Sequence, residues 1–287
     1  QSDHLFTVIN TGLHDKVDTA SVVVDVGTCD FKELHPTEGF KKMAALSLPD
    51  YHVQDLDGHV IEAKIEDLGA GFGYTLPKDK FRQPYIARQV RVTIPIHLAP
   101  LSWSSFQLVE GPAAQSDGIF QNGVIDTPFV TVSVDEGITV YDKTTNEAYE
   151  DFIQFEDRGD IGNEYIYFQP KETEPIFAQL KGYEVLENNA RYAKVLLKHD
   201  FTIPVSADEK LDAEQRGIIE FMKRDAGRSE ELTTIPLETE MTVFVDNPQI
   251  RFKTRFTNTA KDHRIRLLVK THNTRPSNDS ESIYEVV

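Results

Sequence analysis

Apolar and polar residues alternate with a period of two along much of this chain. The alternation is clearest in six segments, namely residues 22–26, 90–96, 130–134, 241–245, 250–256 and 265–269. Successive side chains of a β-strand point to opposite faces of its sheet, so each segment predicts a strand with one buried and one solvated face. Clusters of Gly, Pro, Asn and Asp separate the segments, as is typical of antiparallel sheets. The pattern predicts an all-β fold built from sandwiches.

Residues 110–118, EGPAAQSDG, interrupt this pattern. They are small, polar and turn-prone, which is typical of a linker. We therefore expect a small antiparallel β-sandwich over residues 1–109 and a larger β unit over residues 119–287. The sequence starts with Gln1 instead of Met and stops within the apolar run Ile283–Val287. Both features are expected of a piece of a longer protein, truncated at its C-terminus.

Helical periodicity is scarce. The best candidate is residues 208–224, where several apolar residues fall near one helix face but Gly217 interrupts the run, so we expect a short helix or an ordered loop. The glycine-rich segment 69–73 lacks the following Lys-Ser/Thr of a phosphate-binding loop. It predicts a flexible hairpin loop instead.

The charge balance limits the partners of the chain. Its 287 residues include 47 Asp and Glu against 30 Lys and Arg, a formal charge of −17. Nucleic acids and anionic membranes would repel such a protein, so neither is expected as a partner. No run of about 18 apolar residues and no signal peptide are visible. With Cys29 as its single cysteine, the chain is predicted to be cytoplasmic; homo-oligomer formation is left open.

Motifs for catalysis or metal binding are not found in the sequence. None of the nine histidines forms a His-x-His or HExxH pair, and no GxSxG motif occurs. His199 and His263 each neighbour an aspartate, but adjacent strand residues face opposite sides, so both are expected to be surface or turn histidines. We predict no catalytic residue and no metal ligand in this chain.

The densest polar and aromatic cluster reads FEDRGDIGNEYIY, from Phe155 to Tyr167. Sugars are bound by acceptors for their hydroxyls and by aromatic rings against their apolar C–H face. The candidate substrate-proximal residues are Asp160, Asn163, Glu164, Tyr165 and Tyr167. On a strand, the two tyrosines would share one face. The alternative is an acidic surface hairpin with ordinary strand tyrosines.

This cluster resembles the motif ED.GD.GDEY.Y of glycoside hydrolase family 38, the α-mannosidases. Further segments resemble motifs of that family in the same order, namely Ile94–Val109, Ile138–Thr145, Asn258–Leu268 and Ser282–Val287. Three departures are visible: Asn163 stands where the family usually has Asp, Leu268–Thr271 replaces the common LFPT, and residues 206–231 are longer than the usual connection.

The resemblance implies the central and C-terminal β region of a bacterial-branch retaining α-mannosidase, with a galactose-mutarotase-like supersandwich after the small sandwich. In that family, the Asp nucleophile, the acid and the zinc ligands lie in an N-terminal α/β barrel, which a helical bundle follows. Zinc is therefore implied for the parent enzyme only through residues outside this chain. The implied partners are an α-mannoside substrate, of glycan or mannosylglycerate type, and the parent's own barrel and bundle.

The resemblance also places the loop 160–167 near the catalytic mouth of the barrel, while the isolated chain is expected to be inactive. Two alternatives are the β region of another carbohydrate-active enzyme and a stand-alone sugar-binding module. The upstream sequence would distinguish these interpretations. A different barrel would precede the β region of another enzyme, whereas no barrel would precede a stand-alone module.

A structural role is expected for the motif around residue 263, whose members are Asp262, His263, Arg264 and Arg266. Alternation predicts that Ile265, Leu267 and Val269 are buried. The arginines would then face carboxylates on neighbouring strands. Alternatively, Arg264 or Arg266 holds the barrel of the whole enzyme.

Overall fold

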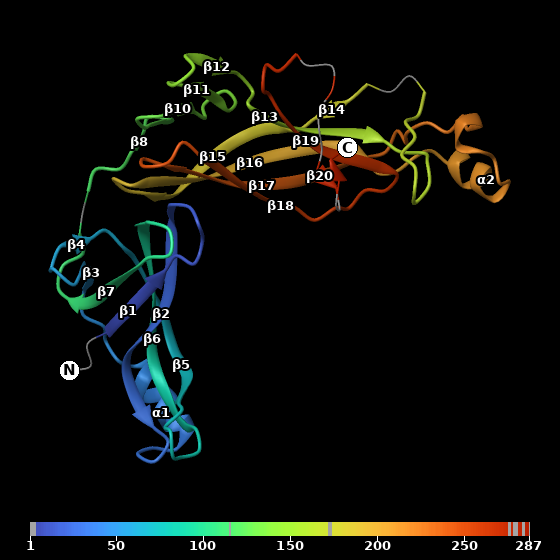
Figure 1. The fold of residues 1–287 in the computed structure, drawn as a ribbon. Helices are drawn as coiled ribbons and strands as arrows, with labels where there is room; N and C mark the ends of the chain where they lie inside the picture. The colour runs from blue at the N-terminus through green and yellow to red at the C-terminus, as the bar shows by residue number, and fades with distance from the viewer. Residues whose placement is uncertain are drawn as a thin grey trace. The chain divides into compact units, whose positions relative to one another are not determined.

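The computed structural model describes residues 4–114, 116–171, 174–274, 277, 281–282 and 285–286. Contacts divide the chain into two compact units, residues 1–118 with 189–192 and residues 119–188 with 193–287. Both consist mainly of β-sheet (Figure 1), which confirms the all-β prediction. Residues 110–118, expected to be a linker, group with the first unit.

Two sheets form the first unit, in the strand orders β1-β7-β3-β4 and β2-β6-β5. Its elements are β1 (His4–Ile9), β2 (Lys16–Asp30), α1 (Pro36–Ala44), β3 (Tyr51–Asp55), β4 (Val60–Ile61), β5 (Lys64–Thr75), β6 (Gln83–Leu98) and β7 (Trp103–Glu110). Alternate β6 residues Val90, Val92 and Ile94 are at most 1% exposed. They share one core with Val53 and Leu108 of the other sheet, as the period-two pattern predicted.

Helix α1 was not predicted from the sequence. Its start is marked by Pro36, and the His35 side chain accepts a hydrogen bond from the second residue of the helix. Gly39 and Met43 are its buried residues, and a Cβ on Gly39 would lie 3.3 Å from Ile86. Only nine residues long, α1 carries too short an apolar stripe to stand out as periodicity.

The glycine-rich segment is part of strand β5, so the prediction of a flexible loop was wrong. A Cβ on Gly71 would lie 2.0 Å from the Gln89 side chain, and one on Gly73 would lie 2.4 Å from the ring of Tyr85. The missing side chains let Gln89 and Tyr85 reach Asp25, at 2.8 and 2.6 Å. The hydrogen bond to Asp25, together with burial, raises the pKa of Tyr85 to about 12. These glycines make room for a polar cluster.

The second unit contains a five-stranded sheet, β12-β11-β10-β9-β8, a four-stranded sheet, β15-β16-β17-β18, and a three-stranded sheet, β14-β13-β19. Its elements are β8 (Phe120–Gln121), β9 (Val124–Asp126), β10 (Val130–Ser133), β11 (Thr139–Asp142), β12 (Glu147–Tyr149), β13 (Ile153–Gly159), β14 (Ile176–Phe177), β15 (Gln179–Asn188), β16 (Tyr192–Pro204), α2 (Lys210–Arg216), the 3₁₀ turn η1 (Phe221–Lys223), β17 (Leu232–Phe244), β18 (Ile250–Arg255), β19 (His263–Val269), β20 (Glu281–Ser282) and β21 (Glu285–Val286). The family-like segment Ser282–Val287 lies only partly within the described residues.

The four-stranded sheet carries the core of this unit. Val195 of β16 and Val243 of β17 share one cluster with Val132 of β10. At another position along the same two strands, Phe201 of β16 and Leu237 of β17 share a second cluster with Phe155 of β13. The long strands β16 and β17 therefore join the two smaller sheets through separate clusters.

The long connection between β16 and β17 contains α2 and η1, which lie at one end of the long strands (Figure 1). Helix α2 is shorter than the predicted 208–224 because Gly217 caps it. The next residue, Ile218, has φ of 55°. Leu211 of α2 packs with Ile161 and Ala226 in a small separate core.

Strand β19 departs from its predicted burial. Ile265 packs against the core around Phe155, but Leu267 and Val269 are 47% and 48% exposed. β19 lies at the edge of its sheet, and in the described part of the chain only the Ile265 end of this face is covered. The prediction of three buried residues was wrong for two of them.

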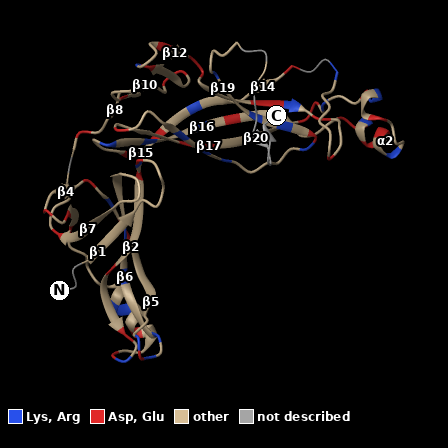
Figure 2. Ribbon diagram, viewed as in Figure 1, with Lys and Arg blue, Asp and Glu red and all other residues tan. Residues whose placement is uncertain are grey.

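Charged residues of both signs are interspersed along the two units (Figure 2). This distribution follows the even spread of charged residues in the sequence. In the described part of the chain, no helix is long and apolar enough to cross a membrane.

Candidate functional site

The two motifs selected from the sequence meet at the paired ends of β13 and β19. In the antiparallel register, Gly159 lies opposite His263 and Arg158 opposite Arg264. Just beyond the strands, the Asp160 N–H donates to the carbonyl of Asp262 at 2.8 Å. Segments separated by about a hundred residues in the chain thus form one local structure.

Asp160 shapes the loop that follows β13. Its Oδ1 accepts hydrogen bonds from the backbone N–H groups of Gly162 and Phe168, at 2.9 and 3.1 Å. A Cβ on Gly162 would lie 1.8 Å from the Ile166 carbonyl oxygen, so this turn requires glycine. One carboxylate oxygen of Asp160 is therefore used within the loop.

Asn163 closes the tip of the same loop. Its Oδ1 accepts hydrogen bonds from the N–H groups of Tyr165 and Ile166, at 3.0 and 2.9 Å. The amide oxygen, which was expected to accept from a sugar, is thus used by the backbone. The NH₂ group is what Asn163 can offer to a ligand.

The two candidate tyrosines differ in surroundings. Their loop is not a strand, so the expectation that they share a strand face was wrong. Tyr165 is 87% exposed. Tyr167 is partly buried under Arg264, whose Cζ lies 4.5 Å from the ring centroid. Burial raises the pKa of Tyr167.

A buried ionic network lies beneath the loop. Asp157 is fully buried; its Oδ1 lies 2.6 Å from His263 Nδ1, and its Oδ2 accepts from Arg228. His263 Nε2 lies 3.0 Å from Asn258 Oδ1. The His263 side chain is 3% exposed, so its prediction as a surface or turn histidine was wrong. His199 is also buried, beside Phe155.

Glu156 forms a second ionic cluster on the other face of β13. It accepts hydrogen bonds from Arg158 at 3.0 Å and from Arg266 at 2.9 Å. Burial by itself would raise the pKa of Glu156, but these two arginines outweigh it and hold the pKa below its ordinary value. Arg266 therefore pairs with a carboxylate across the strands, as the structural role requires.

A pocket of about 810 Å³ opens between the loop and the connection that contains α2 and η1. The loop lines it with Asp160, Gly162, Asn163 and Glu164, and the 262–263 segment contributes Asp262 and His263. The connection lines the other side with Leu211, Gln215, Ile218, Ile219, Glu220, Phe221 and Arg224. Tyr165 and Tyr167 are not among its lining residues.

Sequence reasoning missed Arg224 and Arg228, which join the long connection to the motifs. Arg224 donates through Nη1 to the carbonyls of Ile161 and Gly162, and Arg228 binds Asp157. No motif marks either arginine. The unusual length of residues 206–231 was the only signal in the sequence, and length does not identify a contact.

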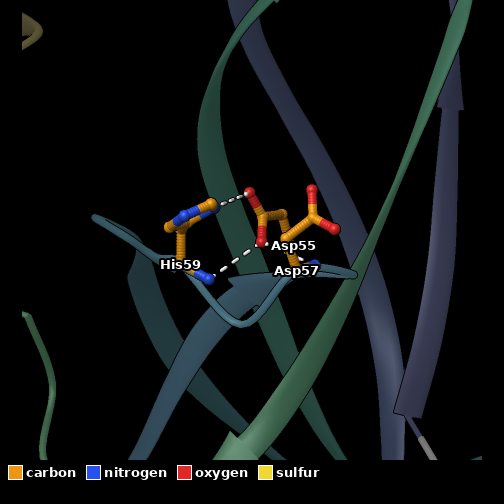
Figure 3. A group of neighbouring side chains, drawn as sticks. All are labelled: Asp55, Asp57 and His59. Carbon is orange, nitrogen blue, oxygen red and sulfur yellow. Dashed lines mark hydrogen bonds and ion pairs between the residues drawn. The ribbon is translucent and has the colours of Figure 1, made fainter.

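One group in the described part of the chain has the composition of a metal site. Asp55, Asp57 and His59 offer ligand atoms within 4.8 Å of one another, in the turn after β3 (Figure 3). However, Asp55 Oδ2 already lies 2.9 Å from His59 Nδ1, and Asp55 Oδ1 accepts from the backbone N–H groups of Asp57 and His59. The Asp55 and His59 side chains therefore stabilise this turn.

An all-β chain with a largely polar pocket fits the class of accessory β regions found in carbohydrate-active enzymes. Residues 1–110 match the family described as "Glycosyl hydrolases family 38 C-terminal domain 1". The resemblance read from the sequence motifs is thereby confirmed.

Relatives extend the similarity over nearly the whole chain. The chain is 31% identical to the "Putative mannosylglycerate hydrolase" of Halalkalibacterium halodurans, over 86% of this chain and 29% of that protein. An α-mannosidase from Enterococcus faecalis V583 has a similar structure, with a TM-score of 0.89 and 34% identity over 99% of this chain and 33% of the other.

A family 38 glycosyl hydrolase protein from Enterococcus faecalis matches with a TM-score of 0.87 and 31% identity. That match covers 99% of this chain and 35% of the other. The chain spans about a third of the length of the relatives it matches.

Proposed function

We propose that this chain is a non-catalytic β region of a retaining α-mannosidase, which supports the catalytic barrel and borders the active site. The observation that carries the proposal is the structural match to an α-mannosidase over 99% of the chain. The substrate is an α-mannoside of the glycan or mannosylglycerate type, and the partner is the parent's own barrel and helical bundle.

The contribution of this chain to the reaction is positioning. The loop from Asp160 to Tyr167 is held by Arg224, which donates to the carbonyls of Ile161 and Gly162, and by the hydrogen bond from the Asp160 N–H to the carbonyl of Asp262. Glu164 and Tyr165 have exposed side chains at its tip, where they are available to hydroxyls and C–H faces of a sugar. The reacting bond of the substrate would lie in the catalytic barrel. A rigidly held loop keeps Glu164 and Tyr165 in place to contact another part of the same substrate.

Zinc belongs to this proposal only through residues outside the chain. Within the described residues, Asp55, Asp57 and His59 lie in a turn where the Asp55 and His59 side chains bind each other at 2.9 Å. No step of hydrolysis is therefore assigned to this chain.

The test is an assay of the full-length protein on a panel of α-mannosides, including mannosylglycerate, with the isolated 287-residue chain as the control. Full-length protein should release mannose, whereas the isolated chain should neither hydrolyse any substrate nor retain stoichiometric zinc after dialysis. Full-length protein that cleaves another class of glycoside, and no mannoside, would refute the proposal.

A further inference from the structure

Arg224 is buried, but not all of its hydrogen-bond donors have a partner within the described residues. It is 8% exposed, and its hydrogen bonds run from Nε to the carbonyl of Ile219 and from Nη1 to the carbonyls of Ile161 and Gly162. Nη2 has no hydrogen bond to any described residue. Because Arg224 lines the pocket, this donor is available to a ligand that enters it.

Ile218, on the same connection as Arg224, also lines the pocket and has a strained backbone conformation. It occupies the position after the Gly217 cap of α2, with φ of 55°, where glycine or asparagine is usual. A β-branched residue is a clear outlier in this region. Ile218 is 88% exposed, so within the described residues no burial of its side chain offsets the energetic cost of this backbone conformation. The side chain contributes an apolar surface to the pocket.

The remaining lining combines acceptors and apolar surface. Asp160 uses only Oδ1 within its loop, and Glu164 is exposed. Phe221 and Ile219 add apolar surface beside them. Several carboxylates disfavour an anionic ligand, while carboxylate acceptors, one arginine donor and an apolar wall suit a neutral polyhydroxylated ring.

We propose that this pocket binds a neutral sugar unit of the α-mannoside, with Arg224 Nη2 donating to a sugar oxygen and Ile218 packing against the C–H face. This inference rests on the proposed function for the identity of the sugar. It assigns a role to the long connection, residues 206–231, which holds both residues.

The experiment is a titration of the 287-residue chain with α-linked mannobioses, followed by NMR shifts of backbone amides and of the Arg224 Nε–H group. Wild type should show saturable shifts around the pocket, with Kd of about 1–10 mM. Arg224→Met and Ile218→Gly should each weaken binding by about threefold to tenfold. Met222→Ala is the matched control: Met222 is an exposed apolar residue of the same connection and does not line the pocket.

Ile218→Gly also keeps the inference falsifiable if Arg224→Met fails to fold, because glycine suits the left-handed backbone. Absence of saturable shifts in the wild type, or equal binding by wild type and Ile218→Gly, would overturn the inference. The titration does not depend on hydrolysis. Mannobiose binding by a chain whose full-length protein cleaves no mannoside would refute the proposed function alone, and the reverse result would refute the pocket alone.

Discussion

His263 Nδ1 on β19 lies 2.6 Å from Asp157 Oδ1 on β13, and both side chains are almost completely buried. Arg228, from the end of the long connection, binds the other carboxylate oxygen. A single carboxylate thus joins two strands and the connection beneath the candidate loop.

Replacing Asp157 by Asn should strongly destabilise the second unit. The substitution leaves the 8%-exposed Arg228 side chain without its counter-charge, and breaking a buried pair in this way costs about 3–5 kcal/mol. Urea unfolding followed by hydrogen exchange of β13 and β19 amides measures the loss for this unit separately.

Asp151→Asn is the control for that experiment. Asp151 is half-exposed and lies 3.6 Å from Lys270, so this variant should lose at most about 1 kcal/mol. If Asp157→Asn and Asp151→Asn lower the free energy of unfolding equally, burial does not make the Asp157 network more stabilising than an exposed ion pair.

Arg264→Ala should weaken the attachment of the loop to β19. The guanidinium lies over the Tyr167 ring, an interaction of about 0.5–1 kcal/mol at an exposed site. A double-mutant cycle with Tyr167→Leu, read out as free energy of unfolding, isolates this pair. Arg216→Ala, at an exposed position on α2, is the control. A coupling energy of zero would contradict the prediction, and in the full-length enzyme the pH profile of catalysis should stay unchanged.

The alternation of apolar and polar residues predicted the buried residues correctly where one face of a strand is covered by a second sheet. Val90, Val92 and Ile94 are buried because a second sheet covers them. The same reasoning was wrong at Leu267 and Val269, since alternation identifies which residues share a face but not what covers that face. Tertiary context decides burial at a sheet edge.

The candidate site was predictable in part for a similar reason. The motifs around Asp160 and His263 could be selected from residue types, and the register of β13 and β19 brings them together. His263 was expected on the surface because its partner Asp157 is 106 residues away in the chain. Arg224 acts through backbone carbonyls, which leave no mark in a sequence.

His199 should make the second unit acid-sensitive. Burial lowers its pKa from 6.5 to about 4, so the folded protein holds the neutral ring while the unfolded chain binds a proton more readily. The contribution to stability is complete above about pH 6.5 and falls as the pH drops toward 4, by up to about 3 kcal/mol. Free energies of unfolding between pH 7 and 4 should decline less steeply in His199→Phe than in wild type. Parallel declines would contradict this prediction.

The loop tip should contribute to substrate binding in the full-length enzyme. Glu164 and Tyr165 are exposed, and Tyr165 is 87% exposed, so Glu164→Gln and Tyr165→Phe remove little within the fold. For Tyr165→Phe, loss of one uncharged hydrogen bond to substrate costs about 0.5–1.5 kcal/mol, or roughly threefold to twelvefold in kcat/KM. For Glu164→Gln, loss of a hydrogen bond to the charged carboxylate costs at most about 3 kcal/mol. We expect reductions of this size on a natural mannoside, with Tm close to wild type.

Tyr74→Phe is the matched control for Tyr165→Phe, because Tyr74 is an exposed tyrosine of the first unit. It should leave kcat/KM unchanged. Measurement of Tm beside the kinetics separates a contact with the substrate from a purely structural role of the loop. Variants of Glu164 and Tyr165 that keep wild-type kcat/KM but melt at lower temperature would show that the loop only braces the junction between barrel and sandwich, because a lost substrate contact lowers kcat/KM without requiring any loss of stability.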